Sequence, residues 1–198
     1  MATLAKGFAF LELLVVLALV AILILAAVPD LRGMEKRRDF ENFARETFEL
    51  LEKCRWKAVN ERAYSGAWFQ QSNGTYFVSL YLDGNENGIR QTDIEEGKDT
   101  RFYGPHRWER SSGDLRPGIL ESTRQIPPRS GFLQPDDPFR FGRSDIISFS
   151  PKGDSSSGTV YLACRSQQQM FAIVLYGPTA RMSLWKFSNS EWQMVGDR

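Results

Sequence analysis

The chain has 198 residues, with 25 Lys and Arg side chains, 24 Asp and Glu side chains and a formal net charge of +1. This length suits one ordinary domain with an additional segment, and it is too short for two domains of typical size. The balanced charge argues against a chain dedicated to nucleic acid. Aromatic residues make up 13% of the chain, which favours a packed, β-rich domain over a disordered chain.

The first segment is an apolar run from Phe8 to Val28 that contains 21 residues and a single charge, Glu12. As an α-helix this run would be about 30 Å long, which matches the hydrocarbon core of a bilayer. A secretory signal peptide has a shorter apolar region followed by a site of small residues, whereas Pro29 and Asp30 follow here. The sequence therefore predicts a transmembrane helix over residues 8–29, with a secretory signal peptide as the alternative.

The residues around the start of this run have a characteristic spacing: Lys6, Gly7 and Phe8 are consecutive, and Glu12 follows four residues later. This arrangement resembles the type III signal of prepilins. The resemblance implies a leader peptide at residues 1–7, cleavage by a prepilin peptidase between Gly7 and Phe8, and methylation of the new terminal Phe8. It also implies an assembly role for Glu12, which would pair with the terminal amine of a neighbouring subunit. A carboxylate that only extends toward lipid headgroups is the alternative for Glu12.

From Met34 to Ala63, apolar residues recur every three or four positions, and charged residues occupy the opposite face. The apolar positions are Phe40, Phe43, Ala44, Phe48, Leu51, Cys54, Ala58 and Val59. This spacing predicts an amphipathic continuation of the first helix over residues 30–65, packed on a sheet of the same chain.

Beyond residue 66 the apolar residues alternate with a period of two, which predicts strands. The predicted strands are Thr75–Leu82, Ile146–Phe149, Thr159–Cys164, Met170–Tyr176 and Met182–Phe187. The close spacing of the last four predicts an antiparallel meander, and the Pro-, Gly- and Arg-rich residues 104–144 predict an irregular insertion with a short strand around Gly118–Ser122. The predicted fold class is therefore α+β: a long N-terminal helix, transmembrane in its first half and amphipathic in its second, packed on the antiparallel sheet of residues 66–198.

Loose motifs along the domain add a second resemblance. They are the DxNxNG stretch from Asp83, the FxPxG stretch from Phe149, the SGT stretch from Ser157, and the turn from Gly177 to Arg181, in which an alanine replaces an expected glycine. In order and spacing they resemble the H-type pseudopilins of type II secretion and the related minor pilins. The resemblance implies a pilin-like fold.

This second resemblance also implies a function. The chain would be a minor pseudopilin of a type II secretion pseudopilus, held in the bacterial inner membrane by a single pass with its C-terminal domain in the periplasm. Its partners would be other pilins or pseudopilins, the prepilin peptidase and the inner-membrane assembly platform. The alternative function is a minor pilin of a type IV pilus, active in assembly, priming or DNA uptake.

Asp83, Asn85 and Asn87, followed by a glycine, have the alternating oxygen ligands and the turn glycine of a calcium loop. The twelfth position of such a loop should be acidic and is Ile94, but Asp93 stands beside it. The candidate calcium ligands are therefore Asp83, Asn85, Asn87 and Asp93. The alternative is an Asn- and Gly-rich turn that ends the strand from Thr75. No other cofactor is expected.

The chain has two cysteines, Cys54 on the apolar face of the predicted helix and Cys164 at the end of a predicted strand. In an exported domain they could meet across the core and form a disulfide. Two buried free thiols are the alternative, because cysteine packs well without a bridge.

Two further classes of function have little support in the sequence. The basic residues near the C-terminus, Arg165, Arg181, Lys186 and Arg198, are interspersed with acidic ones, so nucleic-acid binding is not expected. The one histidine, His106, lies in a predicted loop without a nucleophile motif beside it, so the chain is not expected to be an enzyme.

Overall fold

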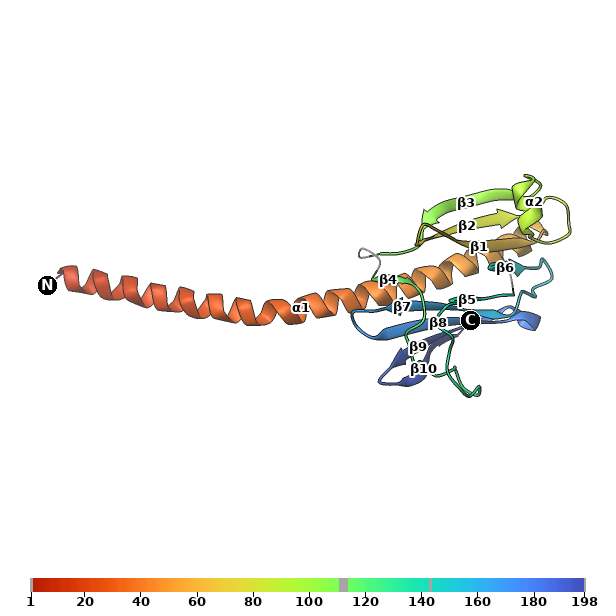
Figure 1. Ribbon diagram of the computed structural model, residues 1–198. Coiled ribbons are helices and arrows are strands. Elements are labelled where there is room, and N and C mark those ends of the chain that lie inside the picture. The colour runs from red at the N-terminus through yellow and green to blue at the C-terminus, as the bar shows by residue number, and fades with distance from the viewer. Residues whose placement is uncertain (1, 111–113, 143, 198) are drawn as a thin grey trace. The chain divides into compact units, whose positions relative to one another are not determined.

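The computed structural model describes residues 2–110, 114–142 and 144–197, without the side chains of residues 2–9 and 24–34. The chain divides into two compact units, Met1–Glu41 and Asn42–Arg198. The elements along the described chain are α1 (Ala2–Glu61), β1 (Ser65–Ser72), β2 (Thr75–Leu82), α2 (Gln91–Glu95), β3 (Thr100–Arg107), β4 (Leu115–Pro117), β5 (Phe139–Arg140), β6 (Ile146–Phe149), β7 (Gly158–Cys164), β8 (Gln169–Tyr176), the 3-10 helix η2 (Gly177–Thr179), β9 (Arg181–Ser188) and β10 (Glu191–Asp197). The fold is α+β, and the strands pair antiparallel (Figure 1).

The first part of α1 differs from the expectation. Among the described residues, no helix has the length and apolarity needed to cross a membrane. The apolar side chains described near its start run from Phe10 to Leu23. By the absence of such a helix among the described residues, the predicted transmembrane half of the helix over residues 8–29 is wrong for the described chain. The same correction applies to the single-pass anchor in the bacterial inner membrane and to the periplasmic placement that depended on it.

One sheet has four strands in the order β3-β2-β1-β6. The prediction for β2 is confirmed at Thr75–Leu82, while β1 and β3 were not predicted. A two-residue turn at Asn73 and Gly74 joins β1 to β2, and both residues have positive φ angles, 50° and 77°. An Asn-Gly pair in this conformation is a turn that matches the twist of a hairpin, which explains the direct antiparallel pairing of the two strands.

The other sheet has six strands, with the main order β10-β9-β8-β7-β4 and with β5 beside β7. Its meander runs from β7 to β10, whereas the predicted meander began at Ile146. That strand, β6, pairs with β1 of the four-stranded sheet instead, so this part of the prediction is wrong. The short strand predicted around Gly118–Ser122 is also misplaced, because β4 ends at Pro117. Before β9, Ala180 has a φ angle of 47°, in the left-handed region that favours the glycine expected there.

The last part of α1, within the second unit, buries its apolar stripe. Phe43, Leu51 and Cys54 have at most 1% of their surface exposed, and the ring of Phe43 lies 5.4 Å from that of Trp108. Strands β1 to β3 are drawn on one side of this part of α1 and strands β7 to β9 on the other (Figure 1). Val59, predicted on the same stripe, is 44% exposed and belongs to the outer surface.

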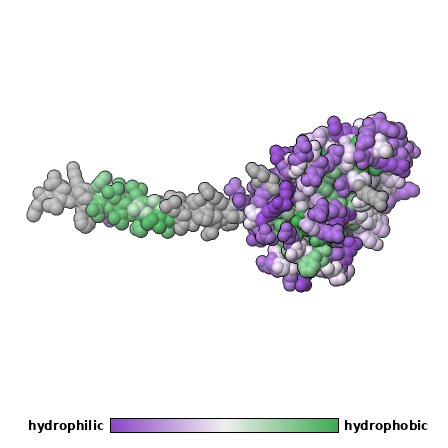
Figure 2. Space-filling model, viewed as in Figure 1, coloured by the Kyte–Doolittle hydropathy of each residue, from purple (hydrophilic) through white to green (hydrophobic). Residues whose placement is uncertain are grey.

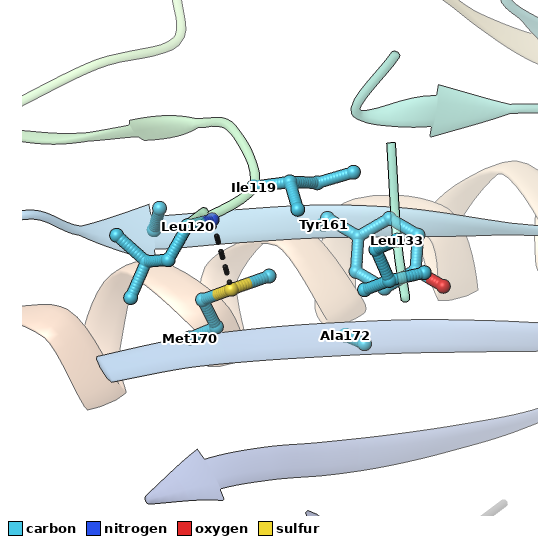
Figure 3. Packing of buried hydrophobic residues seen from close by; sticks show 7 residues of the cluster. Ile119, Leu120, Leu133, Tyr161, Met170 and Ala172 are labelled. Carbon is cyan, nitrogen blue, oxygen red and sulfur yellow. Dashed lines mark hydrogen bonds between the residues drawn. The ribbon is translucent and has the colours of Figure 1, made fainter. Parts of the chain in front are cut away.

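The predicted insertion forms a cover for the outer face of the six-stranded sheet. Ile119, Leu120 and Leu133 pack against Tyr161 and other side chains of β7 and β8 (Figure 3). The backbone N–H of Leu120 donates a hydrogen bond to the sulfur of Met170 at 3.2 Å. Because one side of β7 and β8 faces this cover and the other faces the core, most of their residues are buried. The near-continuous apolar sequence of these strands follows from this double burial.

Candidate functional site

Of the predicted processing and assembly residues, the structure describes the side chain of Glu12 only. It is exposed on α1. The predicted cleavage site lies between Gly7 and Phe8, and the side chain of Phe8 lies outside the described residues. The apolar side chains around Glu12 are also exposed, with values from 45% at Val20 to 69% at Leu23. Figure 2 shows this described stretch as a continuous hydrophobic surface.

The predicted calcium ligands lie in one segment, the connection between β2 and β3, here named the 83–99 loop. Leu82 pairs with Thr100 in the β2–β3 register, so the two ends of the loop, Asp83 and Asp99, lie side by side. Ile89 of this loop is 7% exposed and packs with Tyr81 and Ile146. The loop is therefore anchored on the four-stranded sheet and has a defined conformation.

Asp83 organises the first half of the 83–99 loop. Its Oδ1 accepts hydrogen bonds from the backbone N–H groups of Asn85 at 2.9 Å and Glu86 at 3.0 Å. Its Oδ2 accepts a third from the N–H of Gly88 at 2.7 Å. Gly88 has a φ angle of 86°, which a side chain would disfavour. Asp83 thus acts as an Asx-type cap, the turn function that was the alternative to calcium binding.

Asp93 brings the second predicted carboxylate to the same place. It lies in the first turn of α2 and is 5% exposed. Its Oδ1 lies 3.5 Å from Nζ of Lys98, and its Oδ2 is buried without a hydrogen-bond partner among the residues that the structure describes. The side-chain amide of Asn87 lowers the pKa of Asp93, and burial opposes this effect. The side-chain amide of Asn85 and the ammonium group of Lys98 lower the pKa further. Three of the predicted ligands, Asn85, Asn87 and Asp93, therefore interact within the 83–99 loop.

The structure adds a third carboxylate, Asp99, that the sequence motif did not include. Asp99 is 4% exposed, and its two oxygens accept N–H groups of Gly84 and Arg90, each at 3.4 Å. Burial raises the pKa of Asp99, and the negative charges of Asp83 and Asp93 raise it further. No local spacing signals this residue, because only the pairing of β2 with β3 brings it next to Asp83.

The 83–99 loop departs from a standard calcium loop at its end. Ile94, which occupies the twelfth position, packs against the cluster of Tyr81 and Ile89. Among the residues that the structure describes, no group of three or more His, Cys, Asp or Glu side chains is arranged to hold a metal ion. Any cation here would depend on amide and backbone oxygens as well as on carboxylates.

The two cysteines are both free and buried, so the predicted disulfide is not present in this structure. Cys54 lies on α1 beside Ser65, and burial raises the pKa of its thiol to about 12. Cys164 ends β7 with its Sγ 3.9 Å from a carboxylate oxygen of Asp114. Their different neighbours match the alternative of two separate core thiols.

The remaining candidates are dispersed. Arg181 forms an ion pair with Asp197, and Lys186 lies 5.5 Å from the centre of the Phe171 ring. Arg198 lies outside the described residues. His106 is exposed on β3, against the ring of Tyr103 at 4.4 Å. These contacts are typical of the surface of a folded sheet.

Comparison with known proteins gives no relative: no family model, no curated protein sequence and no solved structure matches this chain.

Proposed function

We propose that this chain is a filament subunit of the pilin-like class, and specifically a minor pseudopilin of a type II secretion pseudopilus. The observation that carries the proposal is the exposed apolar stretch Phe10–Leu23, which contains one carboxylate. Its apolar residues include Leu13, Leu14 and Val15 at consecutive positions, each 50–55% exposed, so they point in several directions around the helix. A patch of this kind marks a surface for association.

The energetics favour a helical bundle as the occupant of this surface. Full burial of a Leu, Val or Ile side chain contributes about 1.5–3 kcal/mol of favourable free energy. Covering the exposed half of each side chain would therefore stabilise the association by roughly 1 kcal/mol per residue. Neighbouring copies of such a helix, or related helices, supply apolar side chains on all sides. The resemblance to prepilins at Lys6, Gly7, Phe8 and Glu12 supports the same arrangement.

Glu12 gives this packing its register. A carboxylate that becomes buried among apolar helices is strongly disfavoured unless it is paired. By resemblance, the partner is the amine that cleavage creates on Phe8 of a neighbouring subunit. Pairing of the two charges allows one axial offset between adjacent helices and disfavours others.

Cross-linking tests the assembly step. Because Cys54 and Cys164 are buried, a cysteine introduced by Leu17→Cys in the exposed stretch would be the accessible thiol. We expect it to form disulfides under mild oxidation with cysteines introduced into the helices of neighbouring filament subunits. Adding Glu12→Gln should greatly reduce this cross-linking, while Glu46→Gln, on the packed part of α1, should leave it unchanged. A Leu17→Cys chain that remains entirely monomeric would contradict the proposal. Cross-links to type IV pilus subunits instead would reassign the chain to the minor pilins.

Intact-mass measurement tests the processing step separately. The proposal requires loss of Met1 to Gly7, a new terminal Phe8 and one added methyl group. Gly7→Val should block the cut, because a branched side chain would crowd the protease cleft. A mature chain that begins near Asp30 would remove the exposed apolar stretch and the proposal with it.

A further inference from the structure

The chain contains two Asn-Gly pairs, and their surroundings differ. They are Asn73-Gly74 in the β1–β2 turn and Asn87-Gly88 in the 83–99 loop. Asparagine is chemically labile, because the backbone nitrogen of the next residue can attack its side-chain amide carbon. The attack closes a five-membered ring between adjacent residues, so no encounter between separate molecules is needed. A glycine in the second position favours this attack, since it has no side chain to crowd the nitrogen.

The first pair has a free backbone nitrogen. Asn73 and Gly74 form the whole turn of the β1–β2 hairpin, and both are exposed. The strand pairing ends at Ser72 and Thr75, so the N–H of Gly74 lies outside the hydrogen-bonded ladder. Among the described residues, none accepts a hydrogen bond from this N–H. A Cβ placed on Gly74 would meet nothing within 4 Å, so the turn has room to bring this nitrogen to the side chain of Asn73.

The second pair has the same residue types, but its nitrogen is held. The N–H of Gly88 donates a hydrogen bond of 2.7 Å to Oδ2 of Asp83, which is 7% exposed. Ile89, the next residue, is buried against the four-stranded sheet. Hydrogen bonds to ionised groups are stronger than those between neutral groups. Attack by the Gly88 nitrogen requires that this bond breaks first, so Asn87 should react at least about tenfold more slowly than Asn73.

A third turn isolates the effect of the glycine. Asn189 and Ser190 form the two-residue turn between β9 and β10, and both are exposed. Their φ angles are 53° and 67°, close to the 50° and 77° of Asn73 and Gly74. The two turns therefore share one backbone class. They differ in the side chain of Ser190, which crowds the nitrogen that would attack Asn189, so Asn189 should react more slowly than Asn73.

We propose that Asn73 is a site of spontaneous deamidation, a modification by water, and that Asp83 protects Asn87 from the same reaction. The nitrogen of Gly74 bonds to Cγ of Asn73, the amide Cγ–N bond breaks, and ammonia leaves with the proton of the Gly74 N–H. The product is a cyclic imide. Water then adds to one of its two ring carbonyls and opens the ring, which gives aspartate by one route and isoaspartate by the other.

The two products differ in their effect on the hairpin. Aspartate preserves the backbone, and Asp-Gly also fits this class of turn, so the change is one added negative charge. Isoaspartate directs the main chain through the former side chain, which lengthens the turn by one atom. Such a turn no longer matches the pairing of Ser72 with Thr75, so this end of the hairpin should open. The inference is independent of the filament function, because the turn is not part of the exposed stretch of α1.

Peptide mapping by mass spectrometry tests the site. The full chain is incubated at mildly alkaline pH in water labelled with heavy oxygen, with a mild detergent that keeps the exposed apolar stretch dispersed. We expect Asn73 to react first, to give both aspartate and isoaspartate, and to gain one heavy oxygen atom in each product. Formation of aspartate alone would contradict the cyclic intermediate. An Asn73 that reacts no faster than Asn87 in the folded chain would overturn the proposal.

Two variants exchange the second residue between the matched hairpins. Gly74→Ser should suppress the reaction at Asn73, and Ser190→Gly should accelerate the reaction at Asn189. Both variants should fold, because each introduced residue already stands at the equivalent position of the other turn. Unchanged rates in both variants would contradict the role given to the glycine.

Denaturant separates protection by Asp83 from the effect of local sequence. In the unfolded chain Gly88 loses its hydrogen bond, so Asn87 should react within twofold of the rate at Asn73. Asn189 should remain slower, because Ser190 still follows it. An Asn87 that remains tenfold slower than Asn73 in the unfolded chain would contradict protection by Asp83.

Discussion

Two stretches of α1, Phe10–Leu23 and the packed part from Asn42 onward, are both rich in apolar residues and have opposite environments. In the first, the large apolar side chains are 45–69% exposed. In the second, Phe43, Leu51 and Ala58 are at most 1% exposed, while Arg45 and Lys53 point outward. Apolar content is therefore not what separates them. The second stretch has a stripe that its own sheets cover, whereas the first is apolar around the helix apart from Glu12 and its described side chains are exposed.

The largest expected effect comes from truncating one apolar side chain in each stretch. Phe43→Ala removes a fully buried ring and its contact with Trp108, so it should lower the free energy of unfolding by about 3–5 kcal/mol. Leu17→Ala, at an exposed position, should change it by less than about 0.5 kcal/mol. Denaturant unfolding followed by tryptophan fluorescence measures both. Similar losses in the two variants would show that the first stretch is covered within its own chain.

An intermediate effect is expected from Cys54, in the packed stretch, which makes the folding stability depend on pH. Because its folded pKa is raised to about 12, its contribution to stability is fully present below the pKa of the unfolded thiol and is lost as the pH rises toward 12. From about pH 9 to pH 10.5, titration of this thiol alone should lower the free energy of unfolding by up to ~2 kcal/mol, since one pKa unit corresponds to 1.36 kcal/mol.

The measurement for Cys54 compares unfolding free energies of the wild type and Cys54→Ala across that pH range. Tyr76 and Tyr161 also have a raised pKa, but they titrate in both proteins. Their contributions to the pH dependence therefore cancel in the difference. The variant should be less stable at neutral pH but lose less stability as the pH rises. Parallel curves would mean that the thiol is not shielded from water in the folded state.

The smallest effect is expected at the outer edge of the packed stretch, where Glu46 forms an ion pair with Arg110. Both side chains are almost half exposed, at 43% and 47%. Solvent screens such pairs, so Arg110→Ala should lower the free energy of unfolding by less than about 1 kcal/mol. A double-mutant cycle with Glu46→Ala isolates the pair from the contact of Arg110 with the Phe43 ring. A coupling above 2 kcal/mol would place this pair in the core rather than at its rim.

Much of the candidate site in the 83–99 loop was visible in the sequence. Asp83, Asn85 and Asn87 are close in sequence, and a turn with a glycine at Gly88 brings them together by local geometry alone. The sequence also indicates Asp93, because it neighbours the position where a calcium loop has an acidic residue. Asp99 and Lys98 were missed because their proximity to Asp83 depends on the register of β2 with β3. A register is a long-range property that no local spacing encodes.

The sequence by itself determined the elements whose patterns are local. Alternation placed β2 at its observed residues, and it identified the cores of β7, β8 and β9, because a strand's faces are set by its own period. The stripe from Phe43 to Ala58 likewise identified the packed face of α1. Together, the helical stripe, the alternating strands and their close spacing predicted the α+β class with antiparallel strands.

Only the tertiary structure decided which strands share a sheet and what covers each face. It joined β6 to β1 rather than to β7, and it used the insertion to bury the outer face of β7 and β8. It also left Cys54 and Cys164 in separate surroundings. These outcomes depend on contacts between residues far apart in the chain, and their free energies arise from shared burial rather than from any segment's own sequence.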